Sequence, residues 1–372
     1  MKIAVDLRSL SSGSVSGVEN YCLNLLEHLL PMDQKNTYTL FYNAFSKQGM
    51  GDFHFVNSSI KNTRLPNKIV NLGLKLKTFN LERLAGDFDY LFMPNLNQFN
   101  VSPKAKVVLT VHDLSPVVTP EFYDVKRRLW HKFLNYKKAF DRANILLAVS
   151  EYTKNDLIRI FNIQPEKIIV TYPGVDHKLF NQNIPIDNLR LARNLYGLPG
   201  EFILFFNTVE PRKNLANLIK AFENLDSDAN LVIAGRLGWK YNKDFKLIKK
   251  SKKSAKIKYI GYVEQQHKPS VIKLAKVLVY PSFYEGFGFQ PLEAMALGTP
   301  VVASQLTSVP EVLGDAGILI NPYSIEDITQ SLKMILSNED LKNQLVAKAL
   351  KRSLNFSWTE TASKTLQAIN TL

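Results

Sequence analysis

Short runs rich in Val, Ile, Leu and Phe alternate with helix-like stretches along the whole chain, and this alternation constrains the fold more than any other feature. The runs include IAVDL at 3–7, VVLTV at 107–111, ILLAV at 145–149, FILFF at 202–206, LVIAG at 231–235 and VLVYP at 277–281. Strands that are apolar on both faces and separated by helices are typical of parallel sheets covered on both sides. Since 372 residues suffice for about two domains, the sequence predicts an α/β protein with two doubly wound sheets.

Capping residues and a polar segment divide the chain further. Ser150 is placed to cap a helix over 151–161, and Ser357 with Glu360 three residues later forms a capping-box pattern for the last helix. The segment 172–185 contains Pro, Gly and polar residues near the middle of the chain. We therefore expect the link between the two domains there.

Composition narrows the class of protein and its location. Hydrophobic residues make up 45% of the chain, but no apolar run approaches the length of a membrane span, and the start MKIAVDLRSL lacks the apolar core of a signal peptide. We expect a soluble, cytoplasmic protein. Cys22 is the sole cysteine, which excludes an intramolecular disulfide and a cysteine metal cluster. The net charge of +14 favours an anionic partner.

The segment 277–304 carries the most specific chemistry. It has the pattern of a strand, a glycine-containing loop and a helix that starts near Phe289. Gly286 and Gly288 allow the backbone to approach a ligand closely, and a helix N-terminus offers unpaired N–H groups to a diphosphate. Glu285 and Glu293 lie eight positions apart, about two helical turns, so both carboxylates can accept hydrogen bonds from sugar hydroxyls in one cleft.

This segment, EGFGFQPLEAMALGTPVV, resembles the signature of glycosyltransferase family 4, a group with the GT-B fold of two Rossmann-like domains facing across a cleft. The resemblance implies that Glu293 holds the donor ribose and that Glu285 contacts the donor sugar. It also implies that Phe287 and Gly288 supply backbone donors to the diphosphate or the sugar. Family members retain the anomeric configuration, generally without a metal held by an Asp-x-Asp motif, so we expect no metal and no cofactor.

A second segment, 206–222, resembles the donor-phosphate loop of the same family. Lys213 matches the family's lysine, while Asn207 and Thr208 stand where many members have Gly-Arg. Arg212 can supply the missing positive charge, because a cation is needed to stabilise the departing nucleoside diphosphate. We therefore place Thr208, Arg212 and Lys213 in the donor site.

Two further candidates lie in the first half of the chain. His112, followed by Asp113, ends a predicted parallel strand, where open α/β sheets bind ligands, and it matches a histidine that lines the cleft in related enzymes. Gly17 belongs to a Gly/Ser loop over 6–20 that faces the cleft in the family, and a plain surface loop explains it equally well.

The resemblance implies three regions. We expect an N-terminal acceptor-binding Rossmann-like domain over 1–175, a C-terminal domain over 176–352 that binds the nucleotide-sugar donor, and a C-terminal helix over 353–372 that crosses back to the N-terminal domain.

The function that follows is retaining transfer of a sugar from a UDP- or GDP-linked donor to a glycan or lipid-linked acceptor in cell-surface polysaccharide synthesis. Three alternatives stay open at this stage. A GT-B sugar-nucleotide epimerase would bind the same donor, a phosphorylase would use inorganic phosphate, and a nucleic-acid-binding protein would explain the charge, although no recognition motif appears.

Basic residues alternate with apolar ones in two segments of the first domain, 67–79 and 126–138. Such segments could rest on an anionic membrane at the inner face of the cell envelope, and core-facing helices with basic outer sides would give the same pattern. A third basic tract, 240–258, has nine lysines and only Asp244 in opposition, which is typical of a solvated helix face.

Overall fold

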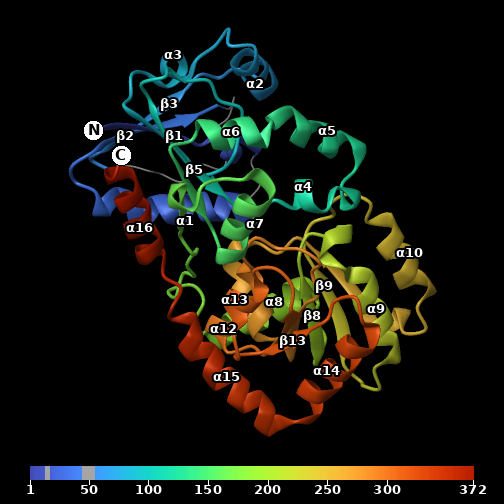
Figure 1. Ribbon diagram of the computed structural model, residues 1–372. Helices are drawn as coiled ribbons and strands as arrows, with labels where there is room; N and C mark the ends of the chain where they lie inside the picture. Colours follow the sequence, from blue (N-terminus) through green and yellow to red (C-terminus); the bar gives the residue numbers. More distant parts are fainter. Residues whose placement is uncertain (13–16, 44–54) are drawn as a thin grey trace. The chain divides into compact units, whose positions relative to one another are not determined.

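A computed structural model describes residues 1–12, 17–43 and 55–372. The chain forms two compact units, each built on one parallel sheet (Figure 1). Unit 1 contains Met1–Leu114, Lys126–Gly174 and Ser357–Leu372, and unit 2 contains Ser115–Val125 and Val175–Phe356. Residues 115–125 therefore belong to unit 2, although the chain before and after them belongs to unit 1.

The sheet of unit 1 has, within the described residues, seven strands in the order β3-β2-β1-β4-β5-β6-β7, and all neighbours are parallel. The strands are β1 Lys2–Asp6, β2 Thr37–Tyr42, β3 Ser58–Asn62, β4 Tyr90–Met93, β5 Lys106–Val111, β6 Ile145–Ala148 and β7 Ile168–Val170. Strand order reverses between β1 and β4, so ligands are expected beyond the carboxyl ends of these strands.

Helices cover this sheet on both faces (Figure 1). They are α1 Gly17–Met32, α2 Asn67–Lys75, α3 Leu81–Ala85, α5 Val125–Leu134, α6 Tyr136–Arg142, α7 Glu151–Phe161 and α16 Trp358–Asn370, with the 3-10 turns η1 Arg8–Ser12 and η3 Pro165–Lys167. The last helix, α16, packs along α1. The ring centroids of Trp358 and Tyr21 lie 5.6 Å apart, and Thr361 Oγ1 donates a hydrogen bond of 2.7 Å to the Tyr172 carbonyl.

The sheet of unit 2 has, among the described residues, six parallel strands in the order β10-β9-β8-β11-β12-β13. They are β8 Phe202–Phe206, β9 Asn230–Ala234, β10 Ile257–Gly261, β11 Val277–Tyr280, β12 Val301–Ser304 and β13 Ile318–Ile320. Here the strand order reverses between β8 and β11. The loops that follow these two strands are therefore the expected ligand-binding edge of unit 2.

The helices of unit 2 are α4 Ser115–Val118, α8 Ile186–Tyr196, α9 Leu215–Asn224, α10 Asn242–Lys250, α11 Lys268–Lys273, α12 Phe289–Leu297, α13 Val309–Leu313, α14 Ile325–Ser337 and α15 Glu339–Ser353, with 3-10 turns η2 Pro120–Phe122, η4 Pro211–Lys213, η5 Ser254–Lys256 and η6 Gln265–His267. The apolar faces of α9 and α14 bury Phe222 and Leu332 against the strands, where Phe205 is fully buried. This packing fixes the sheet whose edge carries the loops described below.

The predicted elements can be compared with these bounds. All six quoted apolar runs are strands, and the predicted pair of parallel sheets is confirmed. The side chain of Ser150 caps α7 by accepting the Thr153 N–H, and that of Ser357 caps α16 by accepting the Thr359 N–H. Within the described ranges, no helix is both long enough and apolar enough to cross a membrane.

Candidate active site

Two loops meet where the strand order of unit 2 reverses, between β8 and β11. We call this place the switch point of unit 2. The first follows β8 and runs from Asn207 to the turn η4, and the second follows β11 and leads into α12. Asn214, which adopts a left-handed conformation with φ 60°, joins them through its side-chain amide. Its Nδ2 donates to the Pro281 carbonyl at 3.0 Å and to the Pro322 carbonyl at 2.7 Å. The loop after β13, which contains Pro322, is thereby tied to the same edge.

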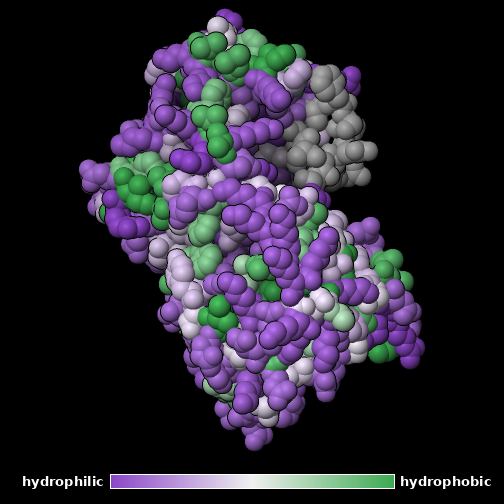
Figure 2. Space-filling view, turned by 90° about the vertical axis from the view of Figure 1, so that its right-hand side faces the viewer, coloured by the Kyte–Doolittle hydropathy of each residue, from purple (hydrophilic) through white to green (hydrophobic). Residues whose placement is uncertain are grey.

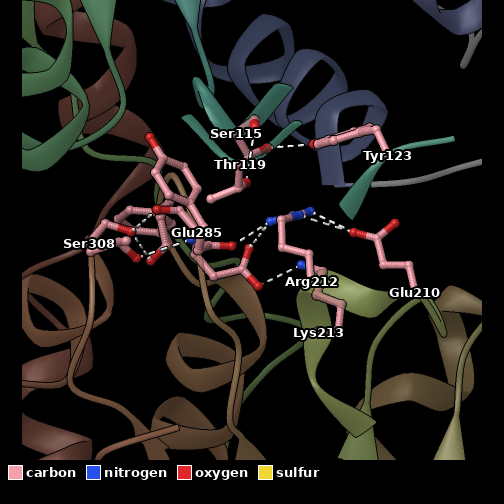
Figure 3. Close-up of polar contacts among 11 residues, drawn as sticks. Ser115, Thr119, Tyr123, Glu210, Arg212, Lys213, Glu285 and Ser308 are labelled. Carbon is pink, nitrogen blue, oxygen red and sulfur yellow. Dashed lines mark hydrogen bonds and ion pairs between the residues drawn. The ribbon is translucent and has the colours of Figure 1, made fainter. Parts of the chain in front are cut away.

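A buried cluster of four charged side chains lies between these loops (Figure 3). Lys213 Nζ donates to Glu285 Oε1 at 2.6 Å, and Arg212 Nη1 contacts Glu285 Oε2 at 3.1 Å. Arg212 also pairs with Glu210, its Nη2 lying 2.9 Å from Glu210 Oε1. All four residues are less than a tenth exposed. Because each carboxylate has a cation at hydrogen-bond distance, the cluster compensates the cost of burying charge.

The main chain also contributes to this cluster. Arg212 Nη1 donates to the Tyr284 carbonyl at 2.6 Å, and the Phe283 N–H donates to the Arg212 carbonyl at 2.9 Å. The two loops are therefore held together in both directions, so the guanidinium of Arg212 has a fixed position.

The charges shift the pKa of several groups. Burial raises the pKa of the Glu285 carboxyl, but Lys213 and then Arg212 outweigh this effect and lower the pKa to about 2. Burial lowers the pKa of the Lys213 ammonium, and the neighbouring Arg212 lowers it further, against the attraction of Glu285. Burial raises the pKa of Glu210. Glu285 is therefore ionised at neutral pH.

The second carboxylate of the motif, Glu293, lies on α12 and has a different environment. Lys268 Nζ lies 2.6 Å from the Glu293 carboxylate and donates to its Oε1. Oε2 is buried and lies 2.6 Å from Lys268 Nζ in the same ion pair, although it accepts no directed hydrogen bond from any residue that the structure describes. Burial raises the pKa of this carboxyl, and Lys268 lowers it only in part. Each carboxylate oxygen has more than one lone pair, so Glu293 can accept a ligand hydroxyl in addition to its ion pair with Lys268.

The glycine loop between the two glutamates is fixed by its neighbours. Ser308 Oγ donates to the carbonyls of Glu285 at 3.0 Å and Phe287 at 2.8 Å, as Figure 3 shows in part. The Glu285 N–H donates to Thr307 Oγ1 at 3.1 Å. Gly288 has φ 128°, a conformation that side chains rarely allow, and α12 begins at the next residue as predicted. The positive end of the α12 dipole therefore points at this loop.

The segment 115–125 of unit 2, which the sequence did not single out, packs directly on the loop after β11. The Phe122 ring stacks on Phe283 at a centroid distance of 5.3 Å, and the Tyr123 ring stacks on Trp239 at 5.2 Å. Trp239 Nε1 donates to the Phe122 carbonyl at 2.6 Å. Figure 3 shows Ser115, Thr119 and Tyr123 beside the charged cluster. We call residues 115–125 the docking segment.

The remaining predicted site residues are dispersed. Thr208 follows β8 in unit 2, before the cluster. His112 and Gly17 belong to unit 1, where Gly17 is the first residue of α1. His112 Nε2 donates to the Pro94 carbonyl at 2.8 Å, and its ring meets Tyr21 edge-on at 4.7 Å. Burial lowers the pKa of His112, so the imidazole is neutral with Nδ1 as its acceptor atom.

Two Asp-x-Asp triplets occur in the chain, at 87–89 and 226–228. Each precedes a strand, β4 or β9, and therefore lies at the amino edge of its sheet, opposite the loops of the switch point. Asp89 Oδ2 accepts the Lys2 N–H at 2.9 Å, and Asp228 pairs with Lys256 at 3.0 Å. In the described ranges no three His, Cys, Asp or Glu side chains gather as a metal site would require.

Two units that are each built on one parallel sheet are typical of the GT-B architecture, and structural comparison agrees. HepE from Anabaena, crystallised with UDP and glucose, aligns with a TM-score of 0.75 and 19% identity over 100% of both chains. WaaG, a glycosyltransferase of lipopolysaccharide biosynthesis, aligns with a TM-score of 0.71 and 16% identity over 98% of both. The predicted GT-B fold is confirmed.

Sequence comparison gives the family. The family described as glycosyl transferases group 1 matches residues 194–352, and that described as glycosyltransferase family 4 matches 15–179. The O-antigen chain mannosyltransferase B of Escherichia coli is 31% identical over 271 residues, covering 72% of this chain and 71% of the relative. WbdA of the same species, a serotype-specific mannosyltransferase, is 28% identical over 72% of this chain, which spans only 34% of that relative. The chain belongs to this glycosyltransferase family, as its EGFG and LEAMA residues predicted.

Proposed function

We propose that this glycosyltransferase transfers a sugar from a nucleoside-diphosphate donor with retention of anomeric configuration, and that its acceptor is a glycan or a lipid-linked glycan of the cell surface. Unit 2 would bind the donor and unit 1 the acceptor. The observation that carries the proposal is the buried cluster of Arg212, Lys213 and Glu285 at the switch point of unit 2. Two fixed cations beside a helix N-terminus are suited to a diphosphate that gains charge as it leaves.

Each site residue has a role in this proposal. Arg212 and Lys213, with the loop N–H groups at Gly286, Phe287 and Gly288, stabilise the diphosphate. Glu293 accepts hydrogen bonds from the ribose, which its carboxylate supports, because its oxygens keep acceptor capacity beside the ion pair with Lys268. Two more residues extend the site: Thr208 lies at the entry of the donor loop, and Glu285 contacts the transferred sugar.

The proposed transfer takes place on one face of the sugar. The acceptor hydroxyl oxygen forms the new bond to C1 as the bond between C1 and the leaving diphosphate oxygen breaks. The hydroxyl proton passes to an oxygen of the leaving diphosphate, so no protein nucleophile is required. His112 and Gly17 of unit 1 are the proposed contacts for the acceptor, and no cofactor or metal takes part.

The sugar and the setting also belong to the proposal. Mannosyltransferase B, WbdA and RfbU are mannosyltransferases by name, and two of them, mannosyltransferase B and RfbU, are named for the O-antigen chain, so a mannosyl donor is the first to test. One of them, RfbU of Salmonella typhimurium, is 29% identical over 61% of this chain and 60% of its own length. We propose a cytoplasmic enzyme that contacts the anionic inner face of the membrane and has no nucleic-acid partner.

The test begins with calorimetric titration of UDP and GDP into the wild type and into Glu293→Gln. Binding of one nucleotide that is lost in the variant supports the donor site and selects the sugar panel. The anomeric configuration of the product, read by NMR, then tests retention, and an inverted product would refute the transfer geometry. Lys213→Ala should lower turnover at least a hundredfold in a folded protein, as loss of one charge-stabilising donor does elsewhere.

A further inference from the structure

Two helices of unit 1 expose large apolar side chains to solvent. On α2 and directly after it, Ile69 is 53%, Leu72 52% and Leu76 64% exposed, and on α5 Leu129 is 63% and Trp130 40% exposed. Single exposed apolar residues are ordinary, but a contiguous group is typical of a surface that binds a partner or a membrane. Figure 2 shows hydrophobic side chains among strongly hydrophilic ones on the part of the surface that unit 1 contributes.

The two helices form one surface at their C-terminal ends. Lys75 Nζ, at the end of α2, donates to the Phe133 carbonyl of α5 at 3.1 Å and lies 3.7 Å from the centroid of the Phe133 ring. The Trp130 ring stacks on the same Phe133 at 5.4 Å. The C-terminal ends of α2 and α5 are therefore neighbours, although 58 positions separate Lys75 and Phe133 in the chain.

A pocket of about 270 Å³ opens at this junction. Four cations are among its lining residues, namely Lys75, Lys77, Lys138 and Arg142, and the lining contains no Asp or Glu. Hydrogen bonds hold Gln98, one of the lining residues, in place. Gln98 Nε2 donates to the Phe133 carbonyl at 2.7 Å, and the Gln98 carbonyl accepts from Arg8 Nη2 at 2.7 Å. A pocket of this size and charge is suited to a small anionic group such as a phosphate.

The surroundings of the pocket extend the same charge pattern. Lys126, Arg128 and Lys132 of α5 are exposed. Cations beside exposed Leu and Trp residues are the combination with which a helix lies in the interface of an anionic bilayer. A free phosphate would use the pocket but would have no use for the apolar side chains around it.

We infer that the pocket between α2, α5 and α6 binds the phosphate headgroup of an anionic lipid, while Leu72, Leu76, Leu129 and Trp130 enter the bilayer interface. This inference rests on the proposed function for its biological role, since it names the residues by which the enzyme would reach a membrane-borne acceptor. The binding surface itself is defined by the residues of unit 1 alone.

The test is sedimentation of the full chain with vesicles of phosphatidylcholine, with and without phosphatidylglycerol. The wild type should sediment with the anionic vesicles only. Replacing the pocket lysines in Lys77→Gln/Lys138→Gln should weaken binding about five- to thirtyfold, because each lysine near an anionic surface contributes a factor of about five. Leu72→Ser/Leu129→Ser should weaken binding as well.

Matched controls lie in unit 2. Lys249→Gln/Lys250→Gln removes two exposed lysines of another basic helix, α10, and Leu195→Ser removes a leucine that is 57% exposed. Neither should change vesicle binding. Equal loss of binding in these controls would show that vesicle binding depends on net charge or on nonspecific hydrophobic contact, and it would overturn the inference.

Two further measurements separate the outcomes. Brominated lipids should quench Trp130 fluorescence in the wild type but not in Trp130→Phe, and equal quenching in both would contradict insertion. Inorganic phosphate binding by calorimetry without any preference for anionic vesicles would mark the pocket as a small-anion site and refute lipid binding. UDP or GDP binding should be unchanged in all these variants, so a failed donor proposal would be recognised separately.

Discussion

The charged cluster makes a quantitative prediction for Glu285→Gln. The pKa of Glu285 falls from an ordinary 4.5 to about 2, although burial acts in the opposite direction. At about 1.36 kcal/mol per pH unit, this difference corresponds to about 3 kcal/mol of folding free energy. Lys213 offsets part of it, because the lowered pKa of its ammonium shows that burial disfavours its charge. We expect Glu285→Gln to cost about 1–3 kcal/mol at neutral pH.

The pH dependence follows from the sign of the shift. A carboxyl whose pKa is lowered on folding stabilises the protein above its unfolded pKa, so the contribution is complete above pH 4.5 and is lost as the pH falls towards 2. For a unit of this size the cost is about 3–10 °C in Tm at pH 7, and it should shrink steadily below pH 4.5.

Thermal unfolding of wild type and Glu285→Gln between pH 3.5 and about pH 8, followed by circular dichroism, measures this difference. Glu339→Gln is the matched control, since Glu339 pairs with Lys342 at the surface, is 70% exposed, and should change Tm by less than about 1 °C. If the difference in Tm between wild type and Glu285→Gln were the same at every pH, the ion pairs could not be its cause.

Two further predictions concern residues outside the sequence motif. Lys268→Gln removes the cation beside the buried Glu293, so nucleotide affinity should fall about tenfold and loss of the ion pair should also lower Tm; unchanged affinity in calorimetry would show that Lys268 has no part in donor binding. Phe122→Ala removes the ring stacked on Phe283, two residues before Glu285, and should lower kcat more than it raises KM. Phe122→Tyr, which keeps the ring, should restore kcat, and a variant pair with equal kcat would exclude a positioning role for this ring.

Much of the fold could be predicted because the buried strands are continuous apolar runs. FILFF and VLVYP have no alternation that could be mistaken for a half-exposed strand, and they are β8 and β11. The edge strand β3 has the sequence SSIKN, with one apolar residue, and nothing in its local pattern distinguishes it from a loop. Edge strands need little apolar surface, so sequence patterns identify them poorly.

Some site residues could likewise be predicted from the sequence motif, whereas others are brought to the site only by packing. Glu285, Gly288 and Glu293 belong to one short segment whose spacing is visible in the sequence. Lys268 belongs to a short helix 25 residues earlier, and only the packing of α11 on α12 brings it to Glu293. The docking segment is harder still to predict, since Trp239 and Phe122 are 117 positions apart and neither stands in a motif.

The two glutamates of the motif are placed in opposite electrostatic environments, and this difference bears on their roles. Glu285 has two cations and a lowered pKa, whereas Glu293 has a raised pKa and both of its oxygens lie beside one cation, Lys268. Glu293 can therefore accept a ligand hydroxyl with a remaining lone pair, beside its ion pair with Lys268. Glu285 can do so only when another anion pairs with Lys213 or Arg212. Without that anion, both buried cations would lose this partner, which is strongly destabilising. In the proposed function a donor diphosphate would supply that anion, so we predict that sugar binding at Glu285 depends on the diphosphate being in place and that free sugar does not bind this site.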